Sequence, residues 1–137
     1  MIKEKKYRLR KGKSIVGYAS ETRHGLFFKG KELLWFMSKT PKYDNVDEYV
    51  GIKDKLKRRV YELDLVRYKL NKGAEENEAI VLWEKKLKSF VLLDINNYYV
   101  TPIFIDEFNI FQHEPVEVTS HLFNHPELMK ALKLYLD

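Results

Sequence analysis

The sequence predicts a mainly β protein with an N-terminal β-rich subdomain, a small antiparallel barrel and a short C-terminal helix. Apolar residues recur at every second position or in short runs bounded by Gly, Lys, Asn or Asp, a pattern typical of strands. Apolar spacing typical of a helix is confined to the last dozen residues. With 137 residues and 45% apolar content, the chain is large enough for one core, because a domain of this size buries about 70% of its unfolded surface.

Residues 1–44 are expected to form the N-terminal subdomain. Gly12 and Gly30 lie in short basic segments suited to turns between antiparallel strands. A loop over residues 38–47 ends the subdomain, although the whole chain is expected to be one compact domain. The predicted strands cover residues 7–9, 14–19, 26–28 and 33–37, and the last of these could instead be a short helix.

Residues 45–137 are expected to form an SH3-like barrel followed by a helix. About five short, twisted strands around an aromatic interior are typical of such barrels, whose closure hides the strand edges. Pro102 and Pro115 are restricted to edges or connections because proline cannot donate to a ladder. Pro126 suits the first position of the terminal helix. The predicted strand segments are 49–52, 65–68, 80–83, 90–93, 98–100, 104–111 and 116–118.

The composition limits the compartment and the chemistry. The chain has no Cys, which excludes disulfides, thiolate catalysis and zinc sites that use sulfur, and favours a cytoplasmic location. The first 13 residues are basic and no apolar stretch follows them, so we expect no signal peptide. No run approaches the roughly 18 apolar residues of a membrane span, so we expect no membrane partner.

Charge is distributed unevenly along the chain. Residues 1–73 hold 20 Lys and Arg against 9 Asp and Glu, a net charge of +11, whereas residues 74–137 hold 5 against 11, a net charge of −6. Such a division is compatible with a basic face for a polyanion or with complementary patches on two copies of the chain. Folding could equally interleave the halves and average the charge.

One segment carries a family resemblance. It reads Tyr49-Val50-Gly51-Ile52-Lys53-Asp54, then Val60-Tyr61-Glu62 and Asp64-Leu65-Val66. This resembles the signature of the YopX-like proteins of phages and prophages, in which an aromatic residue or Thr precedes Gly-Leu-Lys-Asp, a turn and Ile-Tyr-Glu-Gly-Asp-Ile-Val. Further matches at residues 81–83, 90–92, 116–118 and 124–128 extend the resemblance over about residues 49–130, and Lys5-Lys6-Tyr7-Arg8 adds a weaker N-terminal match.

The resemblance implies a mostly β domain from a mobile element that forms a homo-oligomer, and it implies no activity. The matched residues are expected to have structural roles in turns and core: Gly51, Asp54, Tyr61, Glu62 and Asp64. Three positions depart from the pattern by losing a residue suited to positive φ, so these turns are expected to be built differently or to shift in register. They are Leu63 in place of Gly, Leu56-Lys57 in place of Asn-Gly, and Ser120-His121 in place of Gly-Asn.

Two groups of residues are candidates for chemistry. Glu62 and Asp64 would share a face on a regular strand and could act as a carboxylate pair, but no His or nucleophile accompanies them in sequence, and hydrogen bonding to a tight turn is the stronger interpretation. His121 and His125 are four apart but span the junction before the helix, so we expect no metal site there. We therefore predict no catalytic residue, no metal and no cofactor.

Binding is the expected activity. A basic cluster on a predicted turn, with tyrosines nearby, could contact nucleic acid or simply be solvated. A chain of 16.4 kDa has difficulty burying 19 aromatic rings, and those left exposed would form a subunit interface. We expect a non-enzymatic protein that acts by self-assembly or by binding another phage or host protein, with nucleic-acid binding as the alternative. The basic cluster consists of Lys53, Lys55, Lys57, Arg58 and Arg59.

Overall fold

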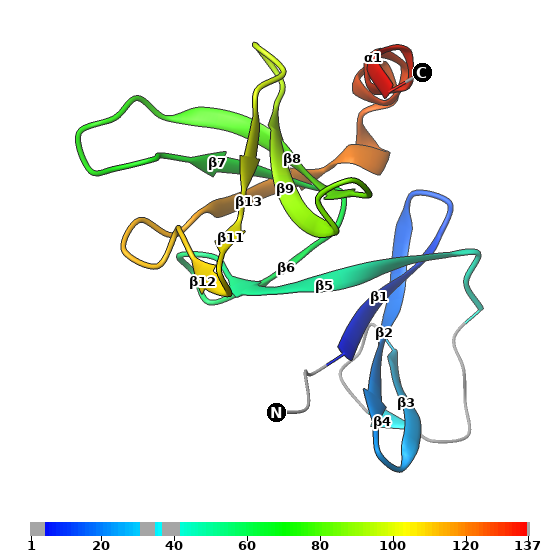
Figure 1. Ribbon diagram of the computed structural model, residues 1–137. Helices are drawn as coiled ribbons and strands as arrows, with labels where there is room; N and C mark the ends of the chain where they lie inside the picture. Colours follow the sequence, from blue (N-terminus) through cyan, green and yellow to red (C-terminus); the bar gives the residue numbers. More distant parts are fainter. Residues whose placement is uncertain (1–4, 31–34, 37–41, 137) are drawn as a thin grey trace. The chain divides into compact units, whose positions relative to one another are not determined.

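The computed structural model describes residues 5–30, 35–36 and 42–136 (Figure 1). The chain divides into two compact units, residues 1–51 and 52–137. The sequence placed a subdomain boundary after residue 44. Residues 45–48 nevertheless pair with the first strand of the chain, and this places them with the N-terminal unit.

The first four strands of the N-terminal unit form an antiparallel meander, and the fifth pairs antiparallel with the first. Gly12, with a φ of 59°, lies in the tight turn between the first two strands, in the left-handed region that favours glycine. The predicted first hairpin is therefore confirmed. The strands are β1 (Lys5–Lys11), β2 (Ser14–Thr22), β3 (Gly25–Gly30), β4 (Trp35–Phe36) and β5 (Asn45–Lys53).

These strands belong to a sheet of order β4-β3-β2-β1-β5-β6, where β6 is Arg59–Tyr61. The structure describes only residues 35 and 36 of the predicted segment 33–37, and they are a strand rather than a helix. Most of the predicted loop 38–47 either lies outside the described residues or begins β5.

A buried ion cluster joins β1 to β5. Asp47 lies opposite Arg8 in the strand register, and Arg8 Nε is 2.9 Å from Asp47 Oδ2. Arg10 reaches the same carboxylate, with Nε 2.8 Å from Oδ2 and Nη2 2.9 Å from Oδ1. All three side chains are buried. Removing one partner would leave a buried charge uncompensated, so the cluster holds β1 against β5 in one register.

The C-terminal unit contains a five-stranded antiparallel sheet of order β10-β9-β8-β7-β13 and a separate hairpin, β11-β12. The predicted meander of three consecutive strands is confirmed by β7, β8 and β9 (Figure 1). The strands are β7 (Asp64–Tyr68), β8 (Asn77–Glu84), β9 (Ser89–Asp94), β10 (Val100–Pro102), β11 (Phe104–Ile105), β12 (Phe108–Asn109) and β13 (Glu117–His121).

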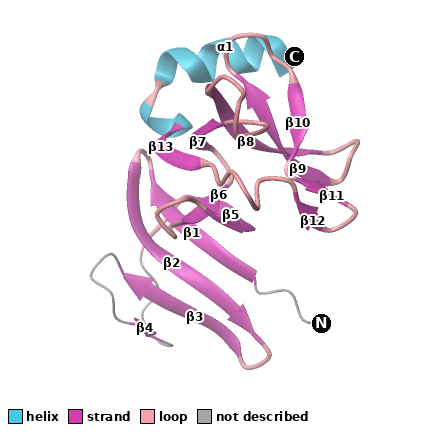
Figure 2. Ribbon diagram, turned by 90° about the vertical axis from the view of Figure 1, so that its left-hand side faces the viewer, coloured by secondary structure: helices cyan, strands magenta, loops and turns pink. Residues whose placement is uncertain are grey.

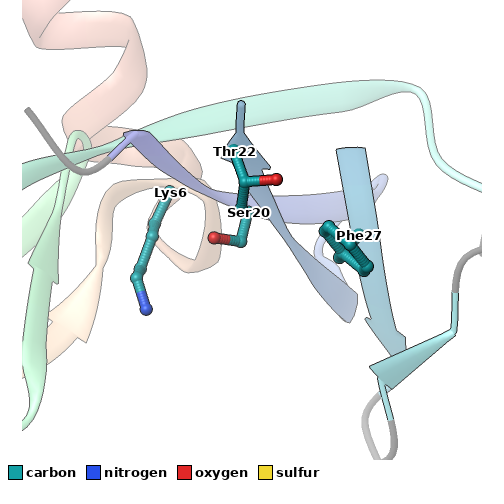
Figure 3. A pocket seen from close by; sticks show the side chains of 4 residues that line it. All are labelled: Lys6, Ser20, Thr22 and Phe27. Atoms are coloured by element: carbon teal, nitrogen blue, oxygen red, sulfur yellow. The ribbon is translucent and has the colours of Figure 1, made fainter. Parts of the chain in front are cut away.

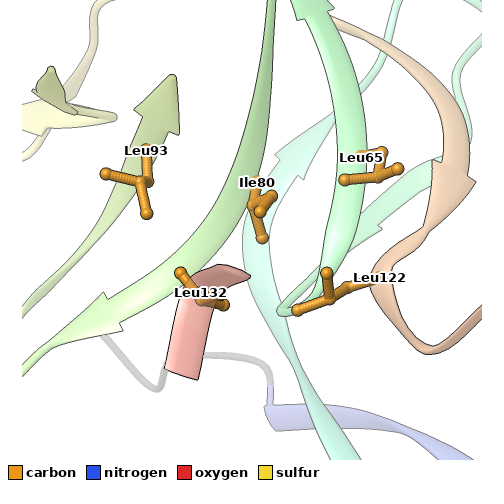
Figure 4. Close-up of a cluster of buried hydrophobic side chains, with 5 residues drawn as sticks. All are labelled: Leu65, Ile80, Leu93, Leu122 and Leu132. Carbon is orange, nitrogen blue, oxygen red and sulfur yellow. The ribbon is translucent and has the colours of Figure 1, made fainter. Parts of the chain in front are cut away.

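The helix covers one face of this sheet. A 3₁₀ turn at Leu122–Asn124 leads into α1 (Pro126–Leu136), which begins at the predicted proline (Figure 2). Side chains from three strands, the 3₁₀ turn and the helix meet beneath it (Figure 4). They are Leu65, Ile80, Leu93, Leu122 and Leu132. No helix among the described residues is long and apolar enough to cross a membrane.

The opposite face of the sheet is also buried. Leu92 on β9 and Val81 on β8 are almost inaccessible, and the ring of Phe111 packs edge-on against Tyr68 on β7, with 6.1 Å between ring centroids. β9 is therefore buried on both faces. This explains why its sequence reads as a continuous apolar run rather than as an alternating strand.

The structure corrects the predicted barrel. The described strands pair into three antiparallel sheets, and no closed barrel is detected among them. β10, one edge of the five-stranded sheet, is three residues long and ends at Pro102, which has no N–H with which to continue a ladder. The coarser prediction of a mainly β fold with a short C-terminal helix is confirmed.

Candidate functional site

The predicted basic cluster lies around a turn organised by Asp54. The buried carboxylate accepts the backbone N–H groups of Leu56 and Arg58 through Oδ1. Its Oδ2 lies 3.0 Å from Arg58 Nε and 2.8 Å from Nη2. Burial by itself would raise the pKa of the Asp54 carboxyl, but the Arg58 side chain and the backbone N–H donors outweigh it and hold the pKa below its usual value.

The same pair of side chains occupies the outer edge of β13. The Val118 N–H donates to Asp54 Oδ2 at 3.1 Å, and the Val118 carbonyl accepts from Arg58 Nη2 at 2.8 Å. Asp54 and Arg58 therefore supply the acceptor and the donor that a neighbouring strand would supply. An edge that is occupied in this way is protected against pairing with another chain.

Two cations of the cluster contact acidic partners within the protein, and a third is half-buried. Arg58 is committed to Asp54 and Val118, and Lys55 Nζ lies 3.5 Å from Glu117 Oε2. Arg59 is half-buried in β6. Lys53 and Lys57 are exposed. The turn thus presents two exposed cations outside these contacts, Lys53 and Lys57, rather than the five expected from the sequence.

The matched acidic residues lie in a second turn. Gly51 has a φ of 104°, which favours glycine at that position of β5. Glu62 and Leu63 form the turn between β6 and β7, so Glu62 and Asp64 do not share one strand face. Asp64 is buried, and its Oδ2 accepts the backbone N–H of Tyr61 at 2.9 Å, which is the expected turn interaction.

A histidine contacts Asp64 in this turn, although no histidine lies near Asp64 in the sequence. His121 Nδ1 lies 2.7 Å from Asp64 Oδ1, and its ring stacks on Phe123 with 5.0 Å between centroids. The sequence separation of 57 residues hid this contact, which arises because β13 pairs with β7 and places His121 opposite Asp64.

A second hydrogen-bonded pair lies next along the chain. Ser120 Oγ is 2.8 Å from His125 Nε2. A serine hydrolase relay requires one imidazole between the hydroxyl and the carboxylate. Here the hydroxyl contacts His125 and the carboxylate contacts His121, so the two pairs do not form such a relay. Among the described residues, no group of three or more His, Cys, Asp or Glu side chains could hold a metal ion.

Another buried carboxylate, Asp94, begins the turn between β9 and β10. Its Oδ1 accepts the backbone N–H groups of Asn96 and Asn97, and its Oδ2 accepts the Tyr68 hydroxyl at 2.8 Å. Burial, followed by the hydrogen bond and charge of Asp94, raises the pKa of Tyr68 to about 12. This carboxylate, like Asp54 and Asp64, serves a turn.

The N-terminal sheet contains a hollow that sequence reasoning missed. A space of about 240 Å³ is lined by Lys6 on β1, Ser20 and Thr22 on β2, and Phe27 on β3 (Figure 3). The register pairs Lys6 with Ser20 and Ser20 with Phe27, so these three side chains form one row across the sheet. The only sequence signal was the period-two alternation on each strand, which does not reveal the register between strands.

Exposed apolar side chains lie on the β11–β12 hairpin and on β8. Ile105 and Phe108 face each other across the hairpin and are 54% and 74% exposed. Ile103, just before the hairpin, donates its N–H to the Phe90 carbonyl, and the Phe90 ring packs edge-on against Trp83, which is 45% exposed. We call Trp83, Ile105 and Phe108 the hairpin surface.

The turn of this hairpin is strained. Asp106 and Glu107, its two central residues, have φ values of 50° and 72°. Two-residue turns with positive φ at both positions favour Asn-Gly or Asp-Gly. Glu107 stands at the second position, where glycine is favoured, and adopts this conformation at a cost. Such strain is commonly stored at functional sites. The acidic pair also places negative charge between the two exposed apolar side chains.

The family follows from a comparison with known families. The model of the YopX protein family matches residues 3–130. The chain belongs to the YopX family. The family match includes the N-terminal sheet, which the sequence resemblance had covered only weakly. No curated protein matches the chain. Membership of the YopX family assigns no reaction to the chain, so the roles of these residues follow from their geometry alone.

Proposed function

We propose that this YopX family protein is a non-enzymatic phage- or prophage-derived protein that acts in the host cytoplasm by self-assembly. The observation that carries the proposal is the β11–β12 hairpin, where a strained acidic turn presents Ile105 and Phe108 to solvent. Apolar side chains of this size exposed together are typical of protein interfaces.

The charge distribution favours a second copy of the chain as the partner. The tip of the hairpin carries Asp106 and Glu107, so a complementary surface should combine apolar contacts with positive charge. The described part of the N-terminal unit holds 9 Lys and Arg against 4 Asp and Glu, a net charge of +5. Contact between the hairpin of one copy and the basic unit of another would be head-to-tail, and such contacts generate rings or filaments.

The test combines a change in the hairpin with a matched control. Phe108→Ser should reduce the mass measured by size-exclusion light scattering toward the 16.4 kDa of one chain. Leu70→Ser, at an exposed leucine outside the hairpin surface, should leave the mass unchanged. A wild-type protein that stays at 16.4 kDa over a wide concentration range would contradict self-assembly.

The proposal that the protein has no catalytic activity can be tested separately. Ser120 is the hydroxyl placed against an imidazole, so it is the residue that a serine-directed fluorophosphonate would modify if His125 activated it. We expect no labelling above that of the Ser120→Ala variant. Stoichiometric labelling of wild-type protein would overturn this part of the proposal.

Nucleic-acid binding is the second candidate. The turn around Asp54 supports it less than expected, because Arg58 and Lys55 are engaged within the protein. The N-terminal sheet supports it more, because the described part of this unit is basic and its strands carry aromatic side chains between cations. Binding to an oligonucleotide that weakens steeply with salt would support this function, and no binding at low salt would contradict it.

A further inference from the structure

The hollow on the N-terminal sheet combines three kinds of chemistry in one place. Lys6 supplies an ammonium group, Ser20 supplies a hydroxyl group, and Phe27 supplies a half-buried aromatic ring (Figure 3). Thr22 completes the lining, and its hydroxyl is already engaged with the turn because it bonds the Gly25 carbonyl and the His24 N–H. The hollow thus offers a cation, a hydrogen-bonding group and an apolar face.

The row beside it adds a second aromatic side chain and a second lysine. Tyr18 pairs with Lys29 in the register and lies two residues from Ser20 on β2, so Tyr18 lies on the same sheet face as Phe27. Arg8, which pairs with Tyr18, is buried against Asp47 and does not contribute to this surface. Lys29 Nζ lies 6.0 Å from the centroid of the Tyr18 ring. Successive aromatic side chains flanked by cations form the surface on which the bases of a single strand stack while their phosphates meet positive charge.

From this arrangement we infer that the hollow of Lys6, Ser20 and Phe27 binds one nucleotide of a single-stranded nucleic acid, with the base against Phe27 and the phosphate against Lys6. The inference rests on the second candidate function and assigns its site. Stacking on an aromatic ring accepts any base, because every base presents a π face, so the site should show little sequence preference.

Strand alternation provides a matched control for charge. Lys5 and Lys6 are neighbours on β1, but Lys6 lines the hollow whereas Lys5 is exposed on the opposite face. The two variants Lys5→Gln and Lys6→Gln change the net charge equally. General electrostatic attraction would respond equally to both, and a site in the hollow would respond to Lys6→Gln.

The experiment is fluorescence anisotropy of a labelled oligo(dT) with the full chain at low salt, after thermal melting has shown that each variant is folded. Phe27→Leu, which keeps an apolar side chain but removes the stacking ring, should weaken binding about tenfold. Lys6→Gln should weaken binding and lower the slope of log affinity against log salt by about one, whereas Lys5→Gln should leave binding close to that of wild type.

The outcomes separate the site from the function. If wild-type protein binds no oligonucleotide at low salt, both the second candidate function and the site are overturned. If wild-type protein binds but Phe27→Leu binds equally well, or Lys5→Gln weakens binding as much as Lys6→Gln, the site alone is overturned. Binding of dTMP as tightly as the oligonucleotide would overturn the assignment to a strand.

Discussion

Several turns of this protein place ordinary side chains where glycine is usual. Lys57 has a φ of 67° and Leu63 a φ of 73°. For an L-residue the left-handed conformation costs roughly 1–2 kcal/mol. Asp54 accepts the N–H groups of Leu56 and Arg58, on either side of Lys57, and Leu63 donates its own N–H to the Val81 carbonyl. These hydrogen bonds hold both turns.

Lys57→Gly should therefore stabilise the protein. Glycine adopts positive φ without the steric cost, so we expect the free energy of unfolding to rise by about 1 kcal/mol in urea denaturation. Lys86→Gly is the control, because Lys86 lies in a turn without positive φ and glycine there should destabilise. Destabilisation by both substitutions would contradict the account of the Lys57 turn.

The raised pKa of Tyr68 predicts how the stability of the protein changes at alkaline pH. Its pKa of about 12 lies above the ordinary value of 10, so between these pH values the folded protein keeps a proton that the unfolded chain loses. The contribution of Tyr68 to the free energy of unfolding should therefore be fully present below pH 10. It should be lost as pH rises toward about 12. Tyr68→Phe should lose less stability over this range in urea denaturation at a series of pH values, and the exposed Tyr99→Phe should follow wild type.

The residue roles were only partly predictable from sequence. The interaction of Asp64 with a tight turn follows from a local pattern, and the structure shows it. At Leu63 and Lys57 we expected altered turns, yet both residues keep positive φ. The Leu63 N–H donates to the distant Val81 carbonyl, whereas the Lys57 turn is held locally by hydrogen bonds to Asp54. At Ser120-His121 the expected shift in register is confirmed, because the pairing of β13 with β7 shifts between Val118 and Ser120. The contact of His121 with Asp64 depends on that pairing, which no local pattern encodes.

At the scale of elements, the Asp54 turn completes the edge of β13. Asp54→Asn removes the negative charge that pairs with Arg58 and replaces one of the two acceptor oxygens of this buried side chain. The free energy of unfolding should therefore fall by about 2 kcal/mol. The Val118 N–H should then exchange with deuterium faster, since it loses its acceptor at an open edge. The exposed Glu75→Gln should change neither quantity. Unchanged protection of Val118 would contradict the account.

The pH dependence of this element has a definite sign. Because the pKa of Asp54 is lowered in the folded protein, its contribution to stability is present above the unfolded value of about 3.9 and is lost as pH falls through the folded pKa. In chemical denaturation below about pH 4, the stability of Asp54→Asn should therefore decline less steeply than that of wild type. An equally steep decline in both proteins would contradict this assignment.

The predictability of the elements follows from the range of the interactions that build them. The terminal helix and the β7–β9 meander were predicted because their signals are local: a proline start, apolar spacing and short polar turns. The closed barrel was not, because closure depends on which edges pair, and β10 ends at Pro102. The exposure of Phe108 was not predictable, since composition indicates that some of the 19 aromatic rings stay exposed but does not show which.

At the scale of the whole molecule, the two units are proposed to present different surfaces to different partners. The strained hairpin of the C-terminal unit is proposed to contact a second copy, and the basic sheet of the N-terminal unit is proposed to hold a strand of nucleic acid. The uneven charge along the sequence anticipated both alternatives, but only the register of β1, β2 and β3 identified a site. If both contacts use the basic unit, oligonucleotide should compete with self-assembly.

The most direct test of the central proposal is whether the hairpin surface is covered in solution. Trp83 belongs to that surface, and in a Trp35→Phe background it is the remaining tryptophan of the two in the chain. We predict that acrylamide quenches its fluorescence weakly at high protein concentration and more strongly on dilution, as copies dissociate and the side chain becomes exposed. Quenching that is strong and independent of concentration would contradict self-assembly through this surface.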